Sequence, residues 1–404
     1  MPYAVVQEGE TDEGDGQIDF FDEVAFAQLE QSLTEEYARY WQQPLSRGAT
    51  LENIQQTLQQ AENEYQTRSG VVYAMFVPPG TETDTPYTSV LSQRLLSNDV
   101  SDNADELLLM FIPPTGNPIQ QRVKVNRRQI QRQAALFGLE ISSFLDNGYQ
   151  PLARQLYDWL LTPIEEEIRQ NGVENLMYVL DSGLSTIPLS AMMTGDTFAV
   201  ERYGLSVLPS VGLLQTDFGE APAPHTVLAG GSAQFAELEA LPAVPVELGL
   251  VESVATASQV FLNEDFEVDN LRTAQAIAPK AMVHVATHAE FNPGALDRSF
   301  IQFWDEQLTL EGLGELGLQD LELLILSACT TALGSRDAEL GFAGLAAAAG
   351  VEASIGSLWN VSDMGTMALM AEFYEQLRGN PLRASALRQA QLSLLQGNTR
   401  IEAG

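Results

Sequence analysis

Apolar positions near the start of the chain follow the period of an α-helix. Residues 26–40 show this period, and so do residues 51–65. One face of the second segment carries apolar side chains at spacings of three and four, namely Leu51, Ile54, Leu58 and Ala61. Side chains spaced in this way lie on one side of a helix. The sequence therefore predicts two helices before residue 69.

Short apolar runs begin after these helices. Residues 71–80 and 106–116 resemble each other, and each run reaches a Pro-Pro pair. A repeated segment at this separation is also found in helical repeat proteins. Both runs are strand-like, however, so two neighbouring strands of one sheet explain them better. Residues 151–172 then form two helical pieces, and residues 175–181 form a buried strand.

A Pro-rich connector at residues 220–226 precedes a more regular pattern. Predicted strands and helices alternate beyond it; the strands are 226–232, 259–264, 282–288, 321–329 and 353–359, and the helices are 246–257, 339–350, 366–377 and 384–395. Strands that are apolar throughout are buried on both faces, so this alternation predicts a mostly parallel sheet with helices on both faces. We expect three parts: an acidic tail with a short helical segment (1–69), an α/β half (70–220) and a second α/β half (221–404).

The composition is strongly acidic. The chain has 20 Lys and Arg against 55 Asp and Glu, a formal net charge of −35. Nucleic-acid binding needs basic side chains that neutralise phosphates, and anionic membrane surfaces attract the same side chains. We therefore expect neither a nucleic acid nor a membrane as a partner. A field of this sign favours basic peptides.

Cys329 is the only cysteine, so the chain has no internal disulfide. With three histidines besides, a structural zinc site has too few ligands, and we expect no metal and no cofactor. No apolar stretch is long enough for a membrane helix, and the first residues lack the pattern of a signal peptide. These features predict a cytoplasmic protein.

Two predicted strands end in reactive side chains. His288 ends one strand, and Cys329 ends the strand that follows it in the regular part of the chain. Ligands of open parallel sheets bind beyond the carboxyl ends of the strands. If the two strands are neighbours, the imidazole can generate or stabilise a thiolate. The alternative is that Cys329 is a buried, inert thiol and His288 a structural residue.

Several motifs together resemble the CHAT domain, a caspase-like, separase-related cysteine peptidase module of bacteria that is often fused to TPR repeats. The motifs lie in the expected order at residues 286–291, 326–334, 338–346 and 357–377, and the N-terminal part of the domain is similar to residues 156–168, 179–192 and 200–210. The resemblance covers roughly residues 70–397. It implies a caspase-like α/β fold in which residues 70–220 form a pseudo-caspase-like half without catalytic residues.

The same resemblance implies a clan CD cysteine endopeptidase. The histidine of the family falls on His288 and its nucleophile on Cys329. The backbone N–H groups of Ala289 and Cys329 would hold the oxyanion, although the general family form has Gly where this chain has Ala289. His284, four residues before His288, is expected to be a buried structural residue.

Substrate contacts are expected at five further positions. In related enzymes an acid near Asp363 accepts a basic side chain before the scissile bond; the alternative is that Asp363 caps a helix that begins near Thr366. Asp181 is a second acidic candidate, or it shapes a turn. Ser357, Leu358 and Trp359 resemble the segment that pairs with an extended substrate, although Trp359 also fits a core position.

The chain departs from the family pattern in two ways. It lacks the TPR array, so a regulatory partner surface is missing or lies in another chain. The aromatic-rich strand that normally follows the last helices is also absent, which suggests a fragment. We therefore expect a cysteine endopeptidase that cleaves protein substrates after a basic residue. The alternative is a catalytically inactive CHAT-fold interaction or scaffold module.

Overall fold

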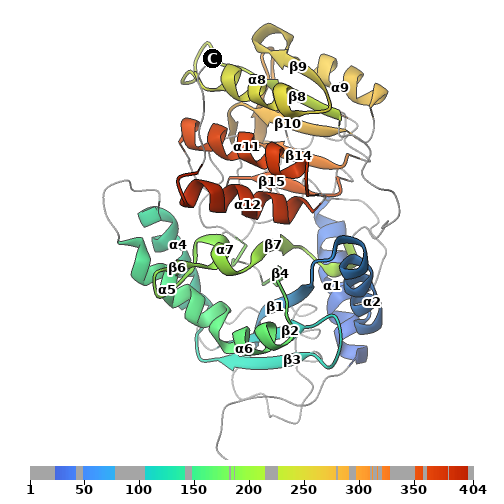
Figure 1. Ribbon diagram of the computed structural model, residues 1–404, viewed down its shortest axis with the longest axis vertical. Helices are drawn as coiled ribbons and strands as arrows, with labels where there is room; N and C mark the ends of the chain where they lie inside the picture. The colour runs from blue at the N-terminus through green and yellow to red at the C-terminus, as the bar shows by residue number, and fades with distance from the viewer. Residues whose placement is uncertain are drawn as a thin grey trace, which may run out of the picture.

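In the computed structural model the chain forms two α/β halves, each built around its own five-stranded sheet (Figure 1). The second half lies above the first in this view. The structure describes residues 23–41, 49–77, 105–141, 148–181, 183–185, 187–213, 226–278, 281–290, 297–309, 312, 316, 321–327, 351–357, 362–380 and 382–398. The predicted acidic tail and the predicted helix at 339–350 lie outside these residues.

The sheet of the first half has the strand order β3-β2-β1-β4-β7. Its strands are β1 (Ser69–Val77), β2 (Glu106–Ile112), β3 (Ile119–Val123), β4 (Asn175–Leu180) and β7 (Gly204–Leu208). β1 pairs antiparallel with β2 and parallel with β4. The two Pro-Pro runs thus contribute neighbouring strands, as the sequence predicted, and β2 ends before its prolines.

Helices cover both faces of this sheet. On one face, alternate β1 residues such as Val72 and Phe76 pack against α4 (Arg127–Ile141), α5 (Tyr149–Leu160) and α6 (Thr162–Gln170). On the other face, Val71 and Tyr73 pack against α1 (Glu23–Trp41) and α2 (Leu51–Tyr65). Burial on both faces explains the unbroken run of buried residues from Val71 to Val77.

The first two helices therefore belong to the first half. The sequence placed them in a separate segment that ended at residue 69, but their apolar faces pack in one core with β1 and β2. A helix with one apolar face needs a partner surface, and the sheet supplies it. The expected boundary between residues 69 and 70 falls inside one packed unit.

The sheet of the second half has the strand order β15-β14-β10-β8-β9, and every pairing in it is parallel. Its strands are β8 (Thr226–Gly231), β9 (Ala257–Leu262), β10 (Met282–Ala286), β14 (Leu323–Leu326) and β15 (Ser354–Gly356). The chain starts at β8, moves outward to β9, and returns to the other side of β8 with β10. The strand order thus reverses between β8 and β10, which are neighbours.

Both faces of this sheet are covered as well. One face packs against α8 (Val244–Val254), α11 (Asp363–Leu377) and α12 (Arg383–Leu395). The other face packs against α9 (Val268–Ile277) and a small antiparallel sheet of β11 (Ala289–Glu290), β12 (Phe300–Gln302) and β13 (Gln307–Thr309). This arrangement confirms the predicted caspase-like α/β fold with a parallel sheet between layers.

Helix α12 joins the two halves. It contacts β7 and the short helix α7 (Ala199–Arg202), and Figure 1 shows it between the second sheet and β7. The Arg388 guanidinium donates to the carbonyl oxygens of Val200 and Glu201, both at 2.8 Å. The remaining short elements are η1 (Leu189–Ala191), β5 (Met193–Thr194), β6 (Thr197–Phe198), η2 (Val211–Leu213) and η3 (Asn263–Asp265).

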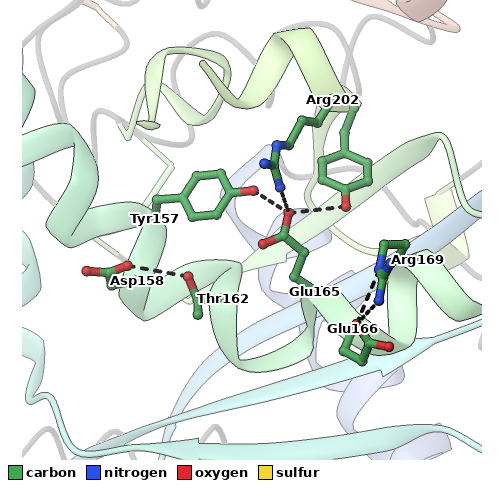
Figure 2. A network of polar contacts seen from close by, with 8 residues as sticks. Tyr157, Asp158, Thr162, Glu165, Glu166, Arg169 and Arg202 are labelled. Atoms are coloured by element: carbon green, nitrogen blue, oxygen red, sulfur yellow. Dashed lines mark hydrogen bonds and ion pairs between the residues drawn. The ribbon is translucent and has the colours of Figure 1, made fainter. Parts of the chain in front are cut away.

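A carboxylate on α6, that of Glu165, binds Arg202 at the end of α7 (Figure 2). Glu165 Oε1 accepts hydrogen bonds from Tyr157 Oη at 2.6 Å, from Arg202 Nη1 at 2.6 Å and from Tyr203 Oη at 3.4 Å. Burial, and then the Glu165 charge, raise the pKa of Tyr203 to about 12. The Tyr203 hydroxyl therefore keeps its proton at neutral pH and remains a donor to Glu165.

Within the described part of the chain, no helix combines the length and the apolar character that crossing a membrane would require.

Candidate functional site

The point where the strand order reverses brings two chain segments together. Residues 232–243 follow β8, and His288 follows β10. Open parallel sheets bind their ligands beyond the carboxyl ends of the strands at such a reversal. The Gly231 position allows the two strand ends to approach, because a Cβ there would collide with the Ala286 carbonyl oxygen. The carboxyl ends of β8 and β10 are therefore the candidate site.

His288 is held by the segment after β8. Its side chain is partly exposed, and its Nε2 lies 2.7 Å from the backbone oxygen of Glu239. The ring of Phe235 contacts the imidazole edge to face, with 4.7 Å between ring centroids. We call these three residues the His288 cluster. A hydrogen bond and an aromatic contact from one loop fix the orientation of the imidazole ring.

The bond to Glu239 also determines the tautomer. A carbonyl oxygen only accepts hydrogen bonds, so Nε2 of His288 carries a hydrogen. In a neutral imidazole the other nitrogen then has a free lone pair. Nδ1 of His288 is consequently the atom that can take a proton from a substrate or from a nucleophile.

Ala289 begins the small antiparallel sheet. The Gln302 N–H donates to the His288 carbonyl oxygen at 2.8 Å, and Ala289 lies opposite Ile301. In an antiparallel ladder this pattern makes Ala289 and Ile301 a non-hydrogen-bonded pair. The Ala289 N–H therefore points away from β12.

The nucleophile candidate, Cys329, lies outside the described residues. The strand that leads to it is described as far as Ser327. β14 pairs parallel with β10, and the Ser327 N–H donates to the Val285 carbonyl oxygen at 2.9 Å. The two predicted strands are thus adjacent, which is the condition that a Cys–His pair requires.

His284 is a buried structural residue, as the sequence predicted. Its Nε2 lies 3.0 Å from Glu247 Oε1, and its Nδ1 lies 3.2 Å from the hydroxyl of Tyr374. The Ser327 hydroxyl donates to the same Glu247 oxygen at 2.5 Å. We call these four residues the buried polar network. It joins α8, β10, α11 and the end of β14.

The two acidic candidates lie in different surroundings. α11 starts at Asp363, and the residue before it, Ser362, is the N-cap whose hydroxyl accepts from the Gly365 N–H at 3.4 Å. The alternative in which Asp363 is the cap is therefore wrong, because the helix begins earlier than the apolar pattern suggested. The Asp363 side chain lies outside the described part of the structure.

Asp181 lies at the end of β4, in the first half. Its Oδ2 accepts from Arg127 Nη2 and from the Phe76 N–H, each at 2.8 Å. The Arg127 guanidinium also lies over the Phe76 ring, 4.6 Å from its centroid. The Asp181 carbonyl accepts the Leu184 N–H, which closes the turn that the sequence offered as the alternative. These contacts give Asp181 a structural role in the first sheet.

The segment expected to pair with substrate follows β15. Ser357 is partly buried at the end of this strand, and Leu358 and Trp359 lie outside the described residues. Among the strands that the structure describes, β15 is at the edge of the second sheet. A strand at an edge can accept another strand.

Most partners of the histidines could not be recognised from the amino-acid sequence. A backbone carbonyl such as that of Glu239 carries no signal in the residue type. In the sequence, Glu247 and Tyr374 look like ordinary residues of amphipathic helices. The one available signal was the pairing rule for buried ionisable groups: a histidine in an apolar strand needs polar partners.

A comparison with protein families gives a match to the CHAT domain over residues 150–402. The matched segment is more than half of the chain, and it contains the whole second sheet with the His288 cluster. The chain belongs to the CHAT domain family. A search of curated proteins gives no match.

The residues that match the CHAT family model contribute strands to both sheets. The match includes β4 and β7 of the first sheet, whereas β1, β2 and β3 precede it. The CHAT domain therefore extends across the boundary that the Pro-rich connector suggested. Clan CD caspase-like peptidases are associated with this domain, which is consistent with the fold.

Proposed function

We propose that this CHAT domain is a cysteine endopeptidase in which Cys329 is the nucleophile and His288 the base. The observation that carries the proposal is the hydrogen bond from His288 Nε2 to the Glu239 oxygen at 2.7 Å. This hydrogen bond leaves Nδ1 of His288 as the basic atom beyond the carboxyl ends of β8 and β10, where the strand order reverses. The adjacency of β10 and β14 supports a position of Cys329 near this imidazole.

The proposed reaction has two steps. Nδ1 of His288 takes the thiol proton, and the Cys329 sulfur forms a bond to the substrate carbonyl carbon. The carbon–nitrogen bond breaks, the imidazolium gives its proton to the leaving amine, and an acyl-enzyme remains. Water then gives a proton to Nδ1 and its oxygen bonds to the acyl carbon. The carbon–sulfur bond breaks, the acid leaves, and the imidazolium returns its proton to the Cys329 sulfur.

Backbone N–H groups would stabilise the oxyanion in both steps. We assign this role to Ala289, which directly follows the proposed base His288, and to Cys329, the proposed nucleophile. Donors that are fixed before the reaction lower the barrier because they need no rearrangement when the charge develops.

A substrate with a basic residue before the scissile bond fits this chain best. Ser362 is the N-cap residue of α11, so the Asp363 carboxylate is not needed to cap this helix. The net charge of −35 attracts basic segments from solution. An extended substrate would pair beside β15 through Ser357, Leu358 and Trp359. We leave Asp181 out of the pocket because Arg127 and Phe76 already bind its carboxylate.

The decisive experiment uses a peptide library with cleavage products identified by mass spectrometry. We expect cleavage by the unchanged chain, and a loss of at least about 10³-fold in Cys329→Ala and in His288→Ala, because both groups take part in every turnover. Circular dichroism should show that both variants stay folded. Retained cleavage in Cys329→Ala would remove the nucleophile assignment.

The second candidate is an inactive interaction module with the same fold, and the strongly acidic composition favours it. Alkylation by iodoacetamide near neutral pH separates the two, because Cys329 is the only cysteine. Fast labelling in the folded state supports the peptidase, since only the thiolate reacts. Labelling no faster than that of a free thiol supports the interaction module.

A further inference from the structure

The buried polar network is unusual for its position. His284 is fully buried, Glu247 is 2 % exposed and Tyr374 is 3 % exposed. Apolar residues of α8, α11 and the second sheet surround them. A carboxylate and an imidazole in such a place are costly to bury, and an apolar set of similar volume can pack there at least as well. The network is therefore expected to do something other than add stability.

Its hydrogen bonds form one continuous chain. Since a carboxylate only accepts, Nε2 of His284 donates to Glu247 Oε1, and the Ser327 hydroxyl donates to the same oxygen. Tyr374 completes the chain at Nδ1. Burial, and then the Glu247 carboxylate, raise the pKa of Tyr374 well above its ordinary value, so its hydroxyl keeps its proton. Each member thus has a fixed partner, which makes the chain rigid.

Ser327 is the member that connects the network to the candidate site. Its side chain is bound to Glu247, and its N–H is bound to the Val285 carbonyl oxygen. It is therefore held from a helix on one side and from β10 on the other. Cys329 follows it by two positions in the sequence.

We propose that Glu247, His284 and Tyr374 are positioning residues that fix Ser327 and thereby the start of the segment that carries Cys329. The proposal rests on the proposed function of Cys329. A second catalytic centre is a poorer explanation, because the Ser327 hydroxyl is bonded to the carboxylate and not to the imidazole. A nucleophile would need the base at that hydroxyl.

The test compares two variants of the network with a matched control. Tyr374→Phe and Ser327→Ala each remove one hydroxyl from the network. Tyr178→Phe removes one hydroxyl from another fully buried tyrosine, which donates to the Leu160 carbonyl oxygen in the first half. Tyr374→Phe and Tyr178→Phe each lose one hydrogen bond of a buried tyrosine, so thermal unfolding should show similar, small losses of stability for these two variants. Ser327→Ala loses a hydrogen bond to a carboxylate and should cost more stability.

We expect the network variants to lower kcat roughly tenfold with KM unchanged within about twofold, because small displacements of a reacting group reduce the rate strongly. The control should keep both values. The pH profile of Cys329 alkylation should move in the network variants toward that of an unassisted thiol. Equal behaviour of the network variants and the control would overturn the proposal.

Alkylation also separates this proposal from the proposed function. It reports on Cys329 without a substrate, so it can be measured even if no cleaved peptide is found. If the network variants change the alkylation of Cys329 but no peptide is cleaved, the positioning role is supported and the proposed peptidase activity is contradicted. Cleavage that depends on Cys329 but is unchanged in Ser327→Ala and Tyr374→Phe contradicts positioning and leaves the peptidase in place.

Discussion

At the scale of single residues, the first half contains a buried acid with a complete set of partners. Glu30 on α1 is fully buried and accepts from Tyr73 Oη at 2.7 Å and from the Gly212 N–H at 3.0 Å. Its Oε2 lies 2.8 Å from Ser210 Oγ, and Ser210 Oγ lies 2.8 Å from Thr34 Oγ1. The Thr34 hydroxyl donates to the backbone carbonyl oxygen of Glu30.

Counting hydrogens favours the neutral acid at Glu30. If Ser210 donates to an ionised Glu30, the Thr34 hydroxyl must share its one hydrogen between the Glu30 carbonyl oxygen and Ser210. If Glu30 is protonated, it donates to Ser210, and Ser210 donates to Thr34, so that every contact has its hydrogen. Burial is the main cause that raises the pKa of Glu30 above its ordinary value, in agreement with this count.

This assignment predicts the pH dependence of stability. A group whose pKa is raised by folding contributes stability that is complete below its unfolded pKa and is lost as the pH rises through the folded pKa. The free energy of unfolding of the unchanged chain should therefore fall, relative to Glu30→Gln, as the pH rises from about 4.5 toward neutral. Chemical denaturation at a series of pH values measures this difference. A difference that is constant or grows with pH would contradict a protonated Glu30.

Residues such as Glu30 also show what the sequence could not reveal. The chain has 55 acidic residues, and nothing in the local pattern separates the few buried ones from the many on the surface. His284 was predictable because the residues around it are all apolar. Glu30 and Glu247 lie in amphipathic helices, where a charge normally faces water, and only the tertiary contacts bury them.

At the scale of secondary-structure elements, the sequence identified most strands and helices but not their ends. The strand predicted at 321–329 is described as β14 (Leu323–Leu326), and the one at 353–359 as β15 (Ser354–Gly356). At the start of β14 the apolar pattern extends beyond the paired residues, because Leu321 is buried in the core before the ladder begins. The adjacency of β10 and β14 also depends on the order of strands, which no local pattern contains.

The start of α11 gives a prediction that separates capping from substrate binding. Ser362→Ala should lower the free energy of unfolding by about 0.5 kcal/mol, because it removes a long cap hydrogen bond, and should leave the cleavage preference unchanged. Asp363→Ala should reduce cleavage after Arg and Lys by about tenfold or more, because the proposed pocket loses its charge. Chemical denaturation and the peptide library measure the two effects. An unchanged preference in Asp363→Ala would move the pocket elsewhere.

At the scale of the whole molecule, the two halves are not independent. The CHAT match contains β4 and β7 of the first sheet together with the entire second sheet, so the contact of α12 with β7 and α7 lies inside one domain. Composition placed a boundary at residues 220 and 221 because the connector is rich in proline. A connector shows only where the chain crosses between sheets, whereas the extent of a domain depends on packing.

Arg388 is the polar link in this contact, and its removal tests how much the link stabilises the molecule. Arg388→Met keeps an apolar stem but loses both hydrogen bonds to the carbonyls of Val200 and Glu201. We expect the free energy of unfolding to fall by about 2 kcal/mol, since hydrogen bonds that involve a charged group contribute about 1.5–3 kcal/mol.

The matched control for this prediction is Arg378→Met, at the C-terminal end of α11. Arg378 forms an exposed ion pair with Glu375 at 3.3 Å, so its replacement should cost less than about 0.5 kcal/mol. Chemical denaturation of both variants measures the difference. Equal losses would mean that apolar packing of α12 alone holds the halves together. A larger loss in Arg388→Met would show that the contact of α12 with α7 inside the CHAT domain depends on this guanidinium.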